Sequence, residues 1–128
     1  MAKKFIFSDN APAAIGPYSH AVEANGMLFV SGQLPLIPET GEVAPGGIAG
    51  QTQQALENID AILKEAGYTK YDVVRAGIFV KNMNDFPTIN EEYEKYFESH
   101  KPARATIEVA RLPKDLDVEI DVIAMKDN

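Results

Sequence analysis

Apolar residues recur at helical spacing in two segments of the chain. From Ile48 to Ala66 they fall three or four positions apart and define one helical face, with Gly67 as the C-terminal stop. A second stripe begins beside Asp85 and Pro87, which suit the first turn of a helix. Its members are Phe86, Ile89, Tyr93, Tyr96 and Phe97. The pattern therefore predicts two amphipathic helices.

Alternating or β-branched segments predict six strands. These segments are residues 3–7, 18–24, 27–32, 71–81, 104–111 and 116–125. Asn25-Gly26 suits the positive φ angles of a type I′ turn and predicts a hairpin. Residues 35–47, rich in proline and glycine, predict a loop, either a functional flap or a plain connector. The order β-β-β-α-β-α-β-β predicts an α+β fold in which two helices cover one face of the sheet.

The last predicted strand presents two different faces. Its apolar positions from Leu116 to Ala124 alternate and suit the face beneath the helices. The opposite positions mix acidic and apolar residues: Glu119, Asp121, Ile123 and Met125. A half-apolar sheet face without helices is typical of subunit packing, so the pattern predicts a homo-oligomer.

Composition excludes several classes of function. A formal net charge of −7 over 128 residues repels nucleic-acid backbones and anionic membranes, and the basic residues are scattered. The absence of cysteine removes thiol nucleophiles, disulfides and thiolate metal sites. No apolar run has the length of a signal peptide or a membrane-spanning helix. We therefore expect a soluble, cytoplasmic protein with residues 1–128 in a single domain.

Arg104 is the most informative candidate for chemistry. Strand alternation places Arg104, Thr106 and Glu108 on one side of their strand. Pairing with the last strand would bring Glu119 or Asp121 near this polar side. The arginine then either forms a structural ion pair or offers its donors to a substrate carboxylate, with Glu119 activating a water.

Other residue types give weaker signals. His20 and His100 lack the spacing of a zinc site, and neither a nucleophile elbow nor a phosphate-binding glycine pattern is present. Tyr18 reads by default as a packing aromatic, and Asn90 as a solvated helix position.

Four segments together resemble a known family. They are "NAPAAIGPYSHAV" (10–22), "VSGQLP" (30–35), "FVKNMNDFPTINEEY" (79–93) and "PARATIEVARLPKDLDVEID" (102–121). In order and spacing they resemble the Rid family of reactive imine deaminases, also called the YjgF family, over nearly the whole chain.

The resemblance implies an activity and an assembly. The activity is 2-iminobutanoate/2-iminopropanoate deamination, which converts imines released by pyridoxal-phosphate enzymes into 2-oxo acids and ammonia without a metal or cofactor. The implied fold is chorismate-mutase-like: a homotrimer whose sheets form a central barrel, with sites between subunits.

The resemblance also implies roles for individual residues. Arg104 would bind the substrate carboxylate, Glu119 would position the hydrolytic water, and Tyr18 would close the pocket from a neighbouring subunit. Small or polar groups would complete the substrate site: Ser31, Gly32, Asn90 and Thr106. Many relatives carry cysteine where this chain has Thr106, which puts thiol-dependent regulation in doubt.

Two alternatives remain open at this point. A ligand-sensing regulatory module would bind 2-oxo or imino acids in the same pocket without turnover. An endoribonuclease or translation inhibitor fits the net charge of −7 poorly.

Overall fold

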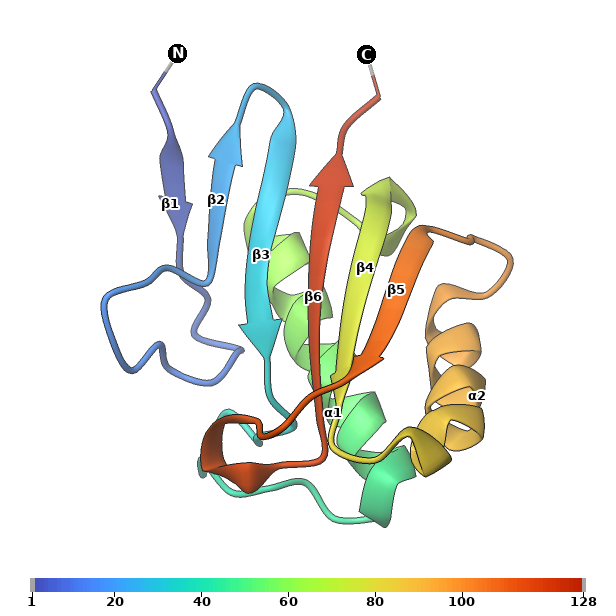
Figure 1. The fold of residues 1–128 in the computed structure, drawn as a ribbon. Helices are drawn as coiled ribbons and strands as arrows, with labels where there is room; N and C mark the ends of the chain where they lie inside the picture. Colours follow the sequence, from blue (N-terminus) through green and yellow to red (C-terminus); the bar gives the residue numbers. More distant parts are fainter. Residues whose placement is uncertain (1, 128) are drawn as a thin grey trace.

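A computed structural model describes residues 2–127 as one six-stranded sheet with two helices (Figure 1). The helices are α1 (Gly47–Glu65) and α2 (Phe86–Phe97). The strands are β1 (Lys4–Ile6), β2 (Ala21–Ala24), β3 (Met27–Gln33), β4 (Val73–Val80), β5 (Ala103–Glu108) and β6 (Val118–Met125). The predicted order of elements is confirmed, with shifts of a few residues at strand ends.

The sheet order is β1-β2-β3-β6-β4-β5. All neighbours are antiparallel except β4 and β5, which are parallel. The parallel pair follows from connectivity, because α2 forms the crossover between the two strands. The prediction that β5 would pair with β6 is therefore wrong. Strand β4 separates the two, and β5 lies at the edge (Figure 1).

Both helices pack on one face of the sheet, as predicted. The interface contains fully buried residues from α1 and from the central strands: Leu56, Ile59, Ile62, Leu63, Ile78, Ile120 and Val122. Asp85 occupies the position before α2, but its side chain makes no capping hydrogen bond. A short 3₁₀ turn, Met83–Asp85, precedes the helix instead, and the side chain of Asn82 accepts from the Asn84 amide.

The opposite sheet face, which we call the open face, has no helix over it. Phe29, Ile107 and Met125 are between 43% and 49% exposed there, although they are large and apolar. Glu119 and Asp121 point to the same face. The mixed character predicted for the last strand is thus confirmed.

Two local features hold the N-terminal region against the sheet. Asn25 and Gly26 have φ angles of 53° and 76°, which confirms the predicted hairpin turn. In the loop before it, the Ser8 amide donates to Nδ1 of His20 and the ring's Nε2 lies 2.7 Å from the Pro12 carbonyl. Since Nδ1 accepts a hydrogen bond, Nε2 carries the proton and donates it to the Pro12 carbonyl. The buried imidazole therefore links the N-terminal loop to the start of β2.

Neither α1 nor α2 is long and apolar enough to cross a membrane, and no other helix of residues 2–127 is either.

Candidate functional site

Arg104 lies on β5 and reaches toward α2. Its backbone lies opposite Ala76 in the parallel register, and Ala76 is fully buried beneath the helices. The guanidinium carbon stands 4.9 Å from the ring centre of Tyr93 and 5.5 Å from that of Phe86. Aromatic faces attract a guanidinium and orient it, while its edge donors stay free. Within residues 2–127 no carboxylate lies within 4.0 Å of this arginine.

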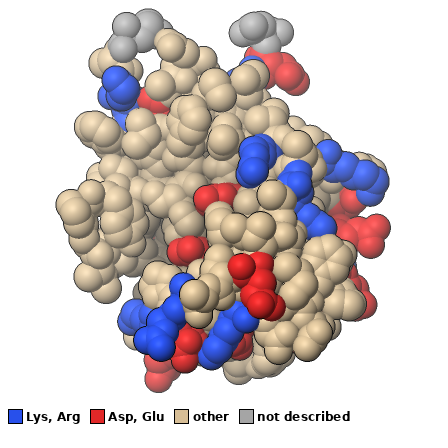
Figure 2. All heavy atoms as spheres, in the orientation of Figure 1, with Lys and Arg blue, Asp and Glu red and all other residues tan. Residues whose placement is uncertain are grey.

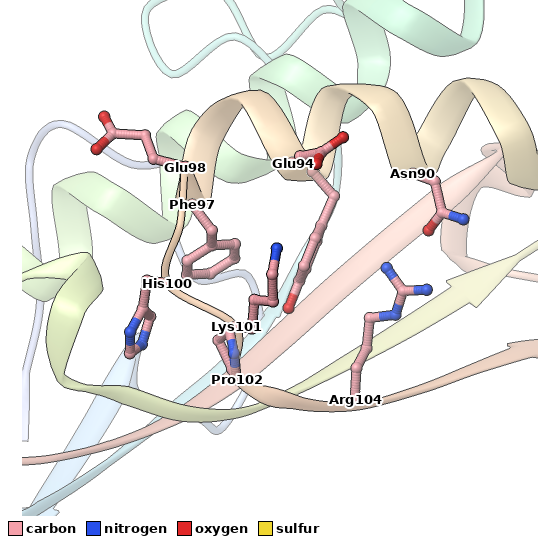
Figure 3. Close-up of a pocket in the computed structure, with 9 residues that line it drawn as sticks. Asn90, Glu94, Phe97, Glu98, His100, Lys101, Pro102 and Arg104 are labelled. Atoms are coloured by element: carbon pink, nitrogen blue, oxygen red, sulfur yellow. The ribbon is translucent and has the colours of Figure 1, made fainter.

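A cavity of about 320 Å³ opens beside the arginine, between α2, the turn after it and the start of β5. Its lining residues are Asn90, Tyr93, Glu94, Phe97, Glu98, His100, Lys101, Pro102 and Arg104. Figure 3 shows the Asn90 amide on the helix side, facing the Arg104 guanidinium on the strand side. The structure therefore brings two of the predicted site residues together.

Two hydroxyl groups on this side of the sheet are buried without a hydrogen-bond partner in the chain. They belong to Tyr93 and Thr106. Thr106 lies two positions along β5 from Arg104 and shares its side of the strand. Burial raises the pKa of Tyr93, partly offset by the positive charge of Arg104. The phenol therefore stays protonated at neutral pH and can donate a hydrogen bond.

Glu119 lies on the other face of the sheet. It pairs with Phe79 in the β4–β6 register, between neighbours that point into the core. The carboxyl is half-buried, and desolvation raises its pKa, with a further rise from the charge of Asp121. A carboxyl whose pKa is raised in this way can exchange a proton with water more readily near neutral pH.

Gly32 on β3 lies against the carboxyl of Glu119, and Ser31 is its neighbour in the same strand. A Cβ atom added to Gly32 would sit 2.8 Å from the carboxyl carbon of Glu119, so only glycine fits without displacing the acid. Ser31 donates from its hydroxyl to the Ser19 carbonyl at 2.7 Å, and its amide donates to His20. Those bonds tie down the segment that carries Tyr18, whose side chain is 48% exposed.

The predicted site residues therefore form two groups. The arginine half-site comprises Asn90, Arg104 and Thr106, on the helix side of β5. The glutamate half-site comprises Tyr18, Ser31, Gly32 and Glu119, around the ends of β3 and β6. The prediction that Arg104 and Glu119 converge within one chain is wrong, because they project from opposite sides of the sheet.

The open face, which carries Glu119, has its own distribution of charged residues. Figure 2, seen from the open face, shows a mainly neutral surface with a few acidic atoms in its hollowed centre, and basic atoms toward its margins. Asp121 faces Arg75 there, and burial raises the pKa of Asp121 while Arg75 lowers it. Within residues 2–127 no group of three or more His, Asp or Glu side chains is arranged to hold a metal ion.

Sequence reasoning missed the aromatic shelf formed by Phe86 and Tyr93. Both residues belong to the apolar stripe of α2 and were interpreted as core. Their spacing of seven gives the only signal, since it places them on one helical face. Without knowledge that β5 runs beside α2, that spacing could not identify the arginine as their partner.

Comparison with known proteins gives one family. The family model described as endoribonuclease L-PSP matches residues 8–126. A RutC family protein of Pyrococcus horikoshii is 52% identical over 125 residues, covering 98% of this chain and 99% of that protein. A 2-iminobutanoate/2-iminopropanoate deaminase of Escherichia coli K12 is 48% identical over 126 residues, covering 96% and 98%.

Solved structures agree with this result. The YjgF gene product from E. coli superimposes with a TM-score of 0.92 at 48% identity, covering 97% of this chain and 99% of that one. E. coli TdcF with bound serine gives the same TM-score at 42% identity and the same coverage.

Proposed function

Since the chain belongs to the Rid family, also called the YjgF or RutC family, we propose that it is a 2-iminobutanoate/2-iminopropanoate deaminase. It would convert reactive imines released by pyridoxal-phosphate enzymes into 2-oxo acids and ammonia. Relatives at 48% identity that carry this activity in their names support the proposal. Such a role in limiting metabolite damage fits the cytoplasmic location predicted from the sequence.

The observation that carries the proposal is the environment of Arg104, which leaves its guanidinium donors available beside a cavity. The arginine keeps its charge at all relevant pH values, so it attracts an anionic partner. The described chain supplies aromatic faces and a cavity beside it, but no carboxylate within 4.0 Å of its guanidinium. A substrate carboxylate is the group that its planar fork of donors fits. Asn90 and the Thr106 hydroxyl would add polar contacts.

The chemistry requires little beyond positioning. The oxygen of a water molecule adds to C2 of the protonated imine, and one of its protons passes to the nitrogen. The C–N bond then breaks as the C–O bond becomes a carbonyl, and the departing ammonia takes up the second water proton as ammonium. Glu119, with its raised pKa, would hold that water and relay the proton. Fixing the substrate carboxylate on Arg104 supplies the orientation that the addition needs.

The site would be completed by assembly. We propose a homotrimer in which the open faces of three sheets form a central barrel and the arginine half-site of one subunit meets the glutamate half-site of the next. Tyr18 would close the pocket from the neighbouring subunit, and the Ser31–Gly32 backbone would approach the ligand. The exposed apolar residues of the open face support this arrangement.

The proposal is tested by generating 2-iminobutanoate in place with a threonine dehydratase and following its disappearance. We expect the protein to accelerate imine loss in proportion to its concentration. A parallel reaction without the protein gives the spontaneous rate. A folded protein that leaves this rate unchanged would contradict the proposal.

A second function is favoured by the solved structure of E. coli TdcF with bound serine, in which a fold of this kind holds a small amino acid. A ligand-sensing module would bind 2-oxo acids without consuming imines, so the same assay separates the two functions. The family description also names an endoribonuclease. Salt-sensitive RNA affinity that survives Arg104→Ala would favour that activity.

A further inference from the structure

The cavity beside Arg104 contains a second cation, Lys101. Both residues line the cavity, and within residues 2–127 neither has a carboxylate within 4.0 Å. In Figure 3 the Lys101 ammonium and the Arg104 guanidinium both point from the strand side toward α2. Neither cation is neutralised within 4.0 Å by the described residues, although the chain has a formal net charge of −7.

The acidic residues nearby are directed elsewhere. Glu98 accepts from Lys70 at 3.0 Å and from the Tyr71 hydroxyl at 2.8 Å. Figure 3 shows the carboxylates of Glu94 and Glu98 on the outer side of α2, away from Lys101 and Arg104. The chain therefore leaves the positive charge of the cavity available to a ligand.

A third donor lies in the same cavity. Tyr93 is 8% exposed, and its hydroxyl is buried without a hydrogen-bond partner. A buried phenol without a partner lowers the stability of the fold. A ligand oxygen that enters the cavity would remove that cost. The cavity thus offers an ammonium, a guanidinium, a phenol and the Asn90 amide within about 320 Å³, the lower end of the range for small-molecule pockets.

One carboxylate does not use all of these groups. A bidentate pair with Arg104 satisfies both oxygens of a single carboxylate and leaves Lys101 without a partner. We propose that the cavity takes organic acids with a second anionic group, which Lys101 binds with the help of the Tyr93 hydroxyl. Resting on the proposed function, this extends the substrate class to dicarboxylic 2-imino acids such as 2-iminosuccinate and 2-iminoglutarate. Lys101 is then the residue that determines specificity.

The binding test uses stable 2-oxo acids and needs no turnover. Isothermal titration would compare 2-oxoglutarate with 2-oxobutanoate for the wild type, Lys101→Gln and Lys101→Arg. We expect the wild type to prefer the dicarboxylate about tenfold, the size of one charge-assisted contact. Lys101→Gln should abolish that preference, and Lys101→Arg should retain it. Equal affinities in the wild type, or a preference unchanged in Lys101→Gln, would overturn the inference.

Lys64→Gln is the matched control. It makes the same change of charge on α1, where Lys64 is 74% exposed and pairs with Asp60. The preference should persist in this variant, because Lys64 lies outside the cavity. A loss equal to that of Lys101→Gln would assign the effect to net charge and overturn the inference. Tyr93→Phe should weaken 2-oxoglutarate binding about threefold, as expected for one neutral hydrogen bond.

Hydrolysis separates failure of this inference from failure of the proposed function. If imines are hydrolysed but dicarboxylates are not preferred, the deaminase stands and the second anion site is wrong. If the lysine-dependent preference is found without any imine hydrolysis, the second anion site stands and the deaminase is wrong.

Discussion

The two half-sites differ in the surroundings of their charged side chains, Arg104 and Glu119. In the arginine half-site the cation lies over the rings of Phe86 and Tyr93, beside a cavity, and has no carboxylate within 4.0 Å in the described chain. In the glutamate half-site burial raises the pKa of Glu119, and within residues 2–127 no basic side chain lies within 4.0 Å of this carboxyl. Desolvation is therefore a cost for Glu119, whereas Arg104 is exposed and solvated.

The fold explains why one chain does not bring the two groups together. The sheet holds Arg104 and Glu119 on opposite faces, so in the proposed trimer they would meet only where two subunits join. The following predictions test this separation.

Arg104→Ala should have the largest effect. Loss of a charge-assisted contact costs up to about 3 kcal/mol, so we expect kcat/KM for 2-iminobutanoate to fall about a hundredfold. The side chain is exposed, and circular dichroism should show an intact fold. Arg111→Ala is the matched control, since Arg111 is also exposed and does not line the cavity. Similar losses in both variants would remove Arg104 from substrate binding.

Glu119→Gln should reduce kcat about 30-fold, somewhat less than the usual effect of general acid–base groups, while affinity for 2-oxobutanoate changes little.

Glu119→Gln should also change the pH dependence of the free energy of unfolding. The raised pKa means that the folded subunit binds the Glu119 proton more tightly than the unfolded chain. The stability of the wild type relative to the variant should therefore fall as pH rises from the ordinary glutamate range through the raised pKa.

Chemical denaturation of dilute subunits at several pH values measures this difference. Glu57→Gln, an exposed position on α1, is the control and should give no such trend. A stability difference between the wild type and Glu119→Gln that stays constant with pH would contradict the assignment.

A mixture of the two impaired variants tests the separation directly. Subunits of Arg104→Ala and Glu119→Gln, unfolded together and refolded, should assemble at random. If each site takes one half-site from each of two subunits, about a quarter of the sites will be intact. Activity should then recover well above that of either variant refolded alone. Absence of recovery in mixtures shown to contain hybrid assemblies would place both residues in one subunit's site.

Gly32→Ala should have the smallest effect of the three substitutions. The new Cβ would meet the carboxyl of Glu119, and this end of the side chain can move. We expect about a fivefold fall in kcat with less than about 1 kcal/mol lost in the free energy of unfolding. Gly26→Ala is a poor control, because its φ of 76° adds backbone strain. An unchanged kcat would show that the position of the acid has no catalytic consequence.

Local patterns were sufficient for the elements of the fold. Helical spacing located α1 and α2, and Asn25-Gly26 located the hairpin. The neighbour of β5 was not predicted, because alternation in a strand specifies its faces but not its partner. The available signal was the helix between β4 and β5, which favours parallel pairing.

The site was harder to predict than the fold. The residue types at Arg104 and Glu119 suggested carboxylate binding and water activation, but the roles proposed for them came from the family resemblance. Their separation depends on which strand lies between β5 and β6, a property of the whole sheet. The aromatic shelf beneath Arg104 depends on the same pairing.

Strand β5 carries Arg104 and also forms an edge of the sheet, with β4 as its one partner in the described residues. An edge strand can recruit strands from other molecules and so promote aggregation. A freshly synthesised subunit would expose the unpaired backbone groups of β5 until another element covers them. If Arg104 binds the substrate as proposed, solubility and activity constrain the same short segment.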